Sequence, residues 1–424
     1  MSIIEDSKKM KKDSPFLAAT SNELRNESLK KIAENLKNNA ALIFEQNAID
    51  LANAEKNNVS AAVMKRLKFN EAKLSDCING INQLISLEDP LHKITLKREL
   101  DKDLILERHT CPIGVIGVIF EARPDALIQI STLCIKSGNC AILKGGKETA
   151  NTNRILFTII YDSIIEAGLP DNSLRLAESY SEIDELLSCD KYVDLIIPRG
   201  SNAFVQYIMN NTKIPVMGHA DGICHIYVDD TFNKDIAISV IKDAKTQYTA
   251  ACNSVETLLI NRKIAASFLP ELSKAMRECG VSLFGTKEVC DIINSSPLKD
   301  EGFIEYLDLC ASVKLVDSVD EAIEHINSFG SHHTDSIITD NIDNANRFKE
   351  LVDSAGVYHN CSTRFADGFR YGFGAEVGIS TGKIHARGPV GLEGLITYKY
   401  TLSGKGHIVD DYATGNKQFH FKDL

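Results

Sequence analysis

The chain has 424 residues, of which 44% are hydrophobic and 25% are charged, and its formal net charge at pH 7 is -11. This length and composition are typical of a soluble protein of two or three globular domains, and they exclude a disordered chain. The negative charge argues against non-specific binding to nucleic acid, and an anionic substrate would need a locally basic pocket.

Cysteine usage and the first residues of the chain predict a cytoplasmic protein. The 11 cysteines have no short periodic spacing, which argues against a disulfide framework and favours a reducing compartment. Residues 1–14 mix acidic and lysine side chains and lack the apolar stretch of a signal peptide. No run approaches the roughly 18 apolar residues of a membrane span. We therefore expect no membrane segment.

The first part of the chain is helical in character. Between about 16 and 87, apolar residues such as Leu29, Ile32 and Leu36 recur at helical spacing, which predicts an α-helical cap. Segments 94–100 and 104–108 then alternate around turn residues, which is typical of a β-hairpin projecting from the body. We expect this hairpin to serve oligomerisation.

Short apolar runs then alternate with helical patterns, which predicts parallel, doubly wound α/β sheets with helices on both faces. Two such alternations follow one another, joined near 218–222, so we expect two α/β domains. The expected strands are 113–120, 141–143, 174–176, 193–197, 214–217, 223–228, 255–260, 281–284, 312–315, 336–338 and 356–358.

One cysteine stands among small residues. Cys252 lies in the stretch 247–254, between a helical run and an apolar segment, and its neighbours Ala251, Asn253 and Ser254 leave room for another molecule to approach the sulfur. The pattern indicates a nucleophile. The alternative, a small buried core residue, stays open on this stretch alone.

Two loops after predicted strands are suited to phosphate. One carries Lys144, Gly145 and Lys147, and the other carries Gly200 and Ser201, each at the start of a helix where free N–H groups and the helix dipole attract anions. Ordinary turns with solvated charges are the alternative for either loop. Together they favour a dinucleotide with extra negative charge, such as a ribose 2'-phosphate.

Metal and hydrolase chemistry find little support. The chain has no C-x-x-C or H-E-x-x-H pattern, His332 and His333 are adjacent, and no G-x-S-x-G elbow is present. We expect no metal site. A cysteine working with a nicotinamide cofactor is the remaining combination. The glycine-rich stretch 368–394, with interleaved basic residues, predicts an ordered binding loop.

Over nearly its whole length, from about 18 to 407, the chain resembles the aldehyde dehydrogenase superfamily and, more closely, its γ-glutamyl phosphate reductase (glutamate-5-semialdehyde dehydrogenase) family. The motifs that carry the resemblance are 117–125, the Lys144 loop, 248–254, 374–381 and 383–389. The resemblance implies an NADPH-dependent reductase of L-glutamyl 5-phosphate in the second step of proline biosynthesis, with Cys252 as the thiol that forms a thioester.

Two departures from the superfamily pattern bear on the mechanism. Met217 stands where hydrolytic members have a glutamate that activates water, so a thioester here would survive for hydride transfer. The asparagine that helps stabilise the oxyanion in those members has no counterpart at 121–123. The Cys252 backbone N–H, the Asn253 side chain and Arg123 are the alternative donors.

The remaining site residues follow from the substrate and from the resemblance. A substrate with a carboxylate and a phosphate needs cations, and surface salt bridges are the alternative for each candidate. These candidates are Arg123, Arg364, Lys383, His385 and Arg387. Glu305 resembles the superfamily glutamate that holds the nicotinamide ribose, and a solvated helix acid is its alternative.

We accordingly expect an NADPH-binding domain at 1–93 and 109–221, a catalytic domain at 222–390, and an oligomerisation element at 94–108 and 391–424. The protein would form homo-oligomers, and association with glutamate kinase, which makes the acyl phosphate, is a further expectation. The rival hypotheses are a hydrolytic aldehyde dehydrogenase and a catalytically silent binding protein on the same fold.

Overall fold

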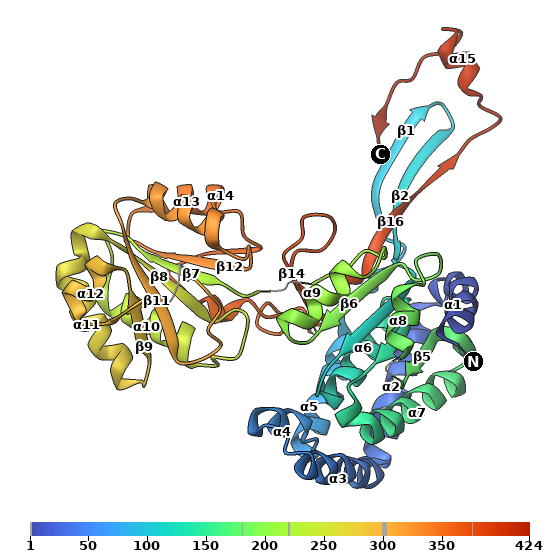
Figure 1. Ribbon diagram of the computed structural model, residues 1–424. Helices are drawn as coiled ribbons and strands as arrows, with labels where there is room; N and C mark the ends of the chain where they lie inside the picture. The colour runs from blue at the N-terminus through green and yellow to red at the C-terminus, as the bar shows by residue number, and fades with distance from the viewer. Residues whose placement is uncertain (1, 180, 219–220, 299–302, 375) are drawn as a thin grey trace.

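The computed structural model describes residues 2–179, 181–218, 221–298, 303–374 and 376–424 (Figure 1). It contains two α/β units and a long antiparallel arm that projects from one of them (Figure 1). The junction predicted near 218–222 is partly outside the described residues, since 219 and 220 are not among them. No helix of the described part of the chain is both long and apolar enough to cross a membrane.

Helices form the N-terminal cap that the sequence predicted. They are α1 (Ile3–Ala18), α2 (Asn22–Asn38), α3 (Ala40–Lys56), α4 (Ala61–Leu67) and α5 (Glu71–Ser86). Ser21 begins α2 as its N-cap, because its side-chain oxygen accepts a hydrogen bond from the Leu24 N–H. Leu29, Ile32 and Leu36 are fully buried in one core with the first sheet, so the cap and that sheet form a single unit.

The first sheet has the strand order β5-β4-β3-β6, and its described pairs are parallel. Its elements are β3 (Val115–Phe120), α6 (Pro124–Lys136), β4 (Cys140–Lys144), α7 (Ala150–Ala167), β5 (Leu174–Ala177), α8 (Ser181–Leu187), β6 (Leu195–Arg199) and α9 (Asn202–Asn210). The strand expected at 214–217 is wrong, since only a bridge joins Val216 to Ile196. Pro215 has no N–H to donate to a ladder there.

The second sheet has the order β10-β9-β11-β8-β7-β12-β13, again with parallel pairs. Its elements are β7 (Cys224–Val228), α10 (Lys234–Thr246), β8 (Val255–Asn261), α11 (Arg262–Glu278), β9 (Ser282–Gly285), α12 (Lys287–Ile293), β10 (Ser296–Pro297), β11 (Cys310–Val316), α13 (Val319–Phe329), β12 (Thr334–Ile338), α14 (Ile342–Leu351) and β13 (Gly356–His359). Alternate residues of its strands belong to different cores: Leu258 packs with α11, and Leu259 packs with α13. Helices therefore cover both faces, which confirms the predicted doubly wound fold.

The arm is an antiparallel sheet of order β16-β2-β1-β17. It is built from β1 (Ile94–Asp101), β2 (Leu104–Pro112), β16 (Ile396–Ser403) and β17 (Lys422–Asp423), with α15 (Val409–Ala413) near its tip (Figure 1). The predicted hairpin is confirmed, and β2 continues to Pro112. The arm exposes several large apolar side chains, among them Tyr398, Tyr400, Leu402, Val409 and Phe421.

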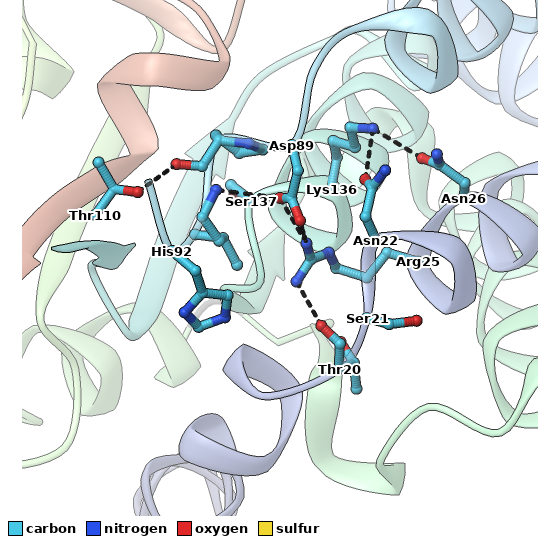
Figure 2. A network of polar contacts seen from close by, with 12 residues as sticks. Thr20, Ser21, Asn22, Arg25, Asn26, Asp89, His92, Thr110, Lys136 and Ser137 are labelled. Carbon is cyan, nitrogen blue, oxygen red and sulfur yellow. Dashed lines mark hydrogen bonds and ion pairs between the residues drawn. The ribbon is translucent and has the colours of Figure 1, made fainter. Parts of the chain in front are cut away.

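A buried polar joint connects the helical cap to the base of the arm (Figure 2). The Arg25 guanidinium is fully buried and binds both carboxylate oxygens of Asp89, at 2.6 and 2.7 Å. Lys136 is also fully buried, and its Nζ donates to the side-chain oxygens of Asn22 and Asn26 at 3.0 and 2.8 Å. Burial lowers the pKa of Lys136. These five residues are called the joint below.

Candidate active site

The cysteine turn lies between α10 and β8, at the amino-terminal edge of the second sheet. Cys252 is partly exposed. Asn253 is buried, its Nδ2 donates to the Ala366 carbonyl at 2.8 Å, and its own carbonyl accepts from Thr363 Oγ1 at 2.7 Å. The amide of Asn253, proposed above as an oxyanion donor, is thus bonded to the turn at 363–366, where it fixes the position of Cys252.

A histidine contacts the sulfur. His333 Nε2 lies 3.2 Å from Cys252 Sγ, and His333 Nδ1 lies 2.9 Å from Thr334 Oγ1. His333 is 1% exposed, so its ring is held inside the protein next to a partly exposed thiol. The pair forms because His333 immediately precedes β12, Cys252 lies three residues before the start of β8, and both strands are neighbours of β7.

The segment that links the two units passes directly over the cysteine. A Cβ added at Gly222 would lie 2.2 Å from the Cys252 carbonyl oxygen and 2.5 Å from its Cα. A side chain at this position would displace Cys252, so glycine is required for the close approach. Cys224, just beyond, is fully buried and its Sγ lies 3.3 Å from the same carbonyl oxygen.

Two arginines lie at neighbouring strand ends of the first sheet. Arg199 ends β6 and pairs in register with Phe120, the last residue of β3, and Arg123 follows three residues later. Burial, and then the charge of Arg123, lower the pKa of Arg199, while nearby carboxylates and Cys252 oppose this shift. The carboxyl edge of the first sheet thus faces the amino edge of the second.

The bend between β3 and α6 is strained. Ala122 has a φ of 47°, in the left-handed region that a non-glycine residue rarely adopts. Its N–H donates to Glu148 Oε1 at 2.8 Å, and Pro124 follows as the first residue of α6. Strain of this kind costs about 1 to 2 kcal/mol and is concentrated at functional sites. Here it lies next to Arg123.

Arg364 approaches the sulfur from the second unit. Its side chain is buried, its Nε donates to Gln247 Oε1 at 2.9 Å, and its guanidinium lies 5.9 Å from the centre of the Tyr248 ring. Burial, followed by the charge of Arg370, lowers the pKa of Arg364, and Cys252 opposes this shift. Arg364 is therefore a buried cation beside the cysteine turn.

The predicted cofactor loops are tightly built. Lys144 is 5% exposed, its Nζ donates to the Gly145 carbonyl at 2.6 Å, and burial lowers its pKa. Lys147 is exposed. A Cβ at Gly145 would lie 2.0 Å from Asn153 Nδ2. The close contact with Asn153 therefore explains why residue 145 is a glycine, whereas the side chain of Lys147 extends into solvent.

The N-terminus of α9 holds a carboxylate. The Ser201 N–H donates to Glu121 Oε2 at 3.3 Å, and a Cβ at Gly200 would lie 2.8 Å from the same oxygen. A free helix N-terminus attracts anions, so this carboxylate stands where a phosphate was predicted.

Glu305 bridges the two units. Its Oε1 accepts the Gly222 N–H at 3.0 Å, and its Oε2 accepts from Asn202 Nδ2, on α9, at 2.7 Å. Asn202 Nδ2 also donates to Asp221 at 2.7 Å. The carboxylate predicted to hold a ribose is thus bonded to the linker and to the first helix turn beyond β6.

The basic residues of the glycine-rich stretch are bonded elsewhere. Lys383 and Arg387 both pair with Asp353, at 2.5 and 3.1 Å, and His385 Nε2 lies 2.8 Å from the Gly394 carbonyl. Hydrogen bonding by Lys383 lowers the pKa of Asp353. These contacts order the hairpin of β14 (Gly378–Ser380) and β15 (Gly388–Val390), and they do not include Cys252.

The sequence interpretation missed His333 and did not place Arg199 near the cysteine. It looked for ligands only at the carboxyl ends of strands, whereas Cys252 and His333 both precede strands of one parallel sheet. A search of the residues before each strand would have found both, but only the strand order β8-β7-β12 brings them together. Among the described residues, no group of three or more His, Cys, Asp and Glu side chains is placed to hold a metal ion.

Comparison with known proteins decides the family. A family model described as the aldehyde dehydrogenase family matches residues 4–293. A gamma-glutamyl phosphate reductase from Acetivibrio thermocellus is 55% identical over 99% of this chain and 97% of its own length. Another, from Pelotomaculum thermopropionicum, is 54% identical over 100% and 98%. The chain belongs to the γ-glutamyl phosphate reductase family.

The fold agrees with this family. The crystal structure of γ-glutamyl phosphate reductase from Thermotoga maritima is 36% identical in sequence and matches with a TM-score of 0.93, covering 96% of this chain and 100% of that one. The γ-glutamyl phosphate reductases are aldehyde dehydrogenase-type oxidoreductases of proline biosynthesis. The predictions of family, enzyme class and α/β fold are confirmed.

Proposed function

We propose that the chain reduces L-glutamyl 5-phosphate to L-glutamate 5-semialdehyde and phosphate with NADPH, through a thioester on Cys252. The observation that carries this proposal is the partly exposed Cys252 sulfur, 3.2 Å from His333 Nε2. The thiolate is the nucleophilic form of cysteine, and the imidazole lies within reach of the thiol proton. Membership of the family supports the reaction, and the position of Cys252 beside His333 supports its role as the nucleophile.

Each step of the proposed reaction is assigned to particular residues of the chain. Cys252 attacks the acyl carbon, phosphate leaves, and the thioester remains on Sγ. Bound NADPH supplies the hydride that turns the thioester into the aldehyde. The Cys252 backbone N–H, Asn253 and Arg123 are the groups we propose for the oxyanion. Met217, where hydrolytic relatives of the superfamily carry a glutamate, cannot activate water, so the thioester persists.

We assign the cofactor to the loops at the carboxyl edge of the first sheet. Gly145 and Gly200 leave no room for side chains, and the α9 N-terminus already binds the Glu121 carboxylate, which supports an anion site there. Lys144 and Lys147 would favour a 2'-phosphate, hence NADPH. Ser201 would bind the pyrophosphate, and Glu305 would exchange its bonds to Gly222 and Asn202 for the ribose.

The substrate's charges match the arginines beside Cys252. In the described part of the chain, Arg123 and Arg199 make no hydrogen bond or ion pair through their guanidinium groups, which leaves them available to the phosphate. Arg364 would hold the α-carboxylate. Lys383, His385 and Arg387 remain candidates for the substrate, but each must first release Asp353 or Gly394.

We also propose that the arm forms a homo-oligomer interface, with domain boundaries as predicted above, and that the protein works in the cytoplasm. Exposed apolar residues gather on the arm, among them Tyr398, Tyr400, Leu402 and Phe421. Light scattering should report an assembly that deletion of 404–424 weakens.

A reverse assay tests the reaction. Glutamate semialdehyde, NADP and phosphate are omitted one at a time, and NADPH formation is followed. We expect turnover only with all three. A hydrolytic aldehyde dehydrogenase would reduce NADP without phosphate, and a silent binding protein would show no turnover in any arm of the assay.

A further inference from the structure

We propose that His333 is a catalytic residue that takes the proton of Cys252 and delivers it to the departing phosphate. This inference deepens the proposed function and rests on it for the identity of the leaving group. The Cys–His pair itself stands on the geometry of the described residues.

The ring of His333 is held at both nitrogens. Nε2 lies 3.2 Å from Cys252 Sγ and Nδ1 lies 2.9 Å from Thr334 Oγ1. If Nδ1–H donates to the threonine, Nε2 carries the lone pair that accepts the thiol proton. A nucleophile, a base and a third group that orients the base are the parts of an activated thiol site.

The backbone keeps the ring in place. His332 has a φ of 59°, and its Nδ1 lies 2.6 Å from the Asp353 carbonyl. The N–H groups of Ala355 and Gly356 donate to the carbonyls of His332 and His333, each at 2.9 Å. The backbone of the turn before β12 is therefore fixed by these bonds, and the His333 ring itself is held by its burial and by its contact with Thr334.

Among the described residues, several other groups near the sulfur are not placed or charged to accept its proton. Arg199 and Arg364 face it from β6 and from the turn at 363–365, and a guanidinium has no acceptor. Burial keeps the pKa of Cys224 well above the usual range, so this thiol stays neutral. Behind them, Asp335 is bonded to His225 and Ser354, and Glu256 is bonded to Lys245.

The protons balance when His333 carries the thiol proton to the departing phosphate. Sγ–H gives its proton to Nε2, and the thiolate forms a bond to the acyl carbon. The bond from that carbon to the phosphate oxygen breaks, and the phosphate takes the proton from Nε2 and leaves as hydrogen phosphate. NADPH would supply the hydride that reduces the acyl group. Once the aldehyde has left, Cys252 remains as a thiolate, and one proton from solvent restores the starting state.

Alkylation of Cys252 tests the pair without substrate or cofactor. The rate of iodoacetamide modification of the Cys252 peptide is measured by mass spectrometry from pH 5.5 to 9.5. His333→Gln keeps a donor near the sulfur but cannot carry a proton. We expect its rate at pH 7 to fall about tenfold and its profile to move to higher pH, because less thiolate is present. The control His359→Gln, whose Nε2 lies 2.9 Å from the Thr339 carbonyl, should match the wild type.

Turnover supplies the second readout. In the reverse assay, kcat of His333→Gln should fall about 100-fold while KM stays within about threefold, as expected for loss of a general acid and base. A folded His333→Gln protein with wild-type alkylation would overturn the proposal. If the variant does not fold, the wild type decides: Cys252 must react faster than glutathione at pH 6, and an equal or slower rate overturns it. Failure of the reaction assay alone would count against the substrate and leave the pair standing.

Discussion

The joint and the cysteine turn are both clusters of buried or half-buried charge, and they differ in how far their charges are satisfied. In the joint, Arg25 is bonded to both oxygens of Asp89, and Lys136 has two amide acceptors (Figure 2). Near the cysteine turn, at the carboxyl edge of the first sheet, Arg123 and Arg199 lie close together, and their guanidinium groups have no hydrogen-bond acceptor in the described part of the chain. The charges of the joint are paired, with only the buried Arg25 Nε lacking a partner among the described residues, and such a cluster holds the architecture together. Two neighbouring cations without a partner are suited to bind an anion.

The largest expected effect is a loss of kcat when the Cys252 thiol is removed. Cys252→Ala should lower kcat of the reverse assay by at least about 10⁴-fold, because the covalent route is lost. Its melting temperature and its affinity for NADPH, measured by fluorescence titration, should stay as in the wild type. Retained turnover would refute the nucleophile assignment.

In the joint we expect the opposite result, a loss of stability without a loss of activity. Asp89→Asn leaves the fully buried Arg25 without its carboxylate, so we expect the free energy of unfolding to fall by about 3 kcal/mol. Urea titration measures it, and kcat of the folded variant should not change. Glu88→Gln is the matched control, because the neighbouring pair of Glu88 with Lys93 is exposed and should have no measurable effect. Equal losses in the two variants would contradict the comparison.

A buried ion pair in the second unit makes the free energy of unfolding depend on pH, which allows a further comparison with the joint. Lys245 Nζ lies 2.7 Å from Glu256 Oε2, and both side chains are buried. Burial, only partly offset by Lys245, raises the pKa of Glu256 to about 7. Because this exceeds the unfolded value of about 4.3, the stabilisation is complete below about pH 4 and is lost as the pH rises through 7.

Glu256→Gln has no carboxyl group to ionise. Between pH 5 and 8, the free energy of unfolding of the wild type should therefore fall relative to that of the variant by about 2 to 3 kcal/mol. Urea titrations of both proteins at several pH values measure this difference. Parallel pH curves would show that the pair behaves like the satisfied joint.

The smallest expected effect tests the open cluster. Arg199→Gln removes one of two neighbouring cations, so the KM for phosphate in the reverse assay should rise about tenfold, which is about 1.4 kcal/mol. Stability should not fall, since the repulsion from Arg123 is relieved. Arg154→Gln, in an exposed pair with Glu178, is the control. An unchanged KM for phosphate would place the leaving group elsewhere.

Local pattern predicted much of the molecule. The strands of both sheets except the two-residue β10, the hairpin at 94–108 and the boundary position of Cys252 follow from periodicity and from small residues at the ends of elements. The strand expected at 214–217 was wrong because Pro215 cannot join a ladder. Predicted site residues such as Lys383 and Arg387 proved to be bonded to Asp353, a partner that spacing does not reveal.

The sequence by itself determined the family and the doubly wound units, and it singled out Cys252 as the candidate thiol, because these depend on motifs and on periodicities of two and 3.6 residues. Only the tertiary structure decided that His333 meets Cys252 across 81 positions of the chain. It also decided that Arg199 lies near enough to Cys252 for their charges to interact. The order of strands in a parallel sheet, and the way one sheet edge meets another, are set by long-range packing, and no local pattern in the chain records them.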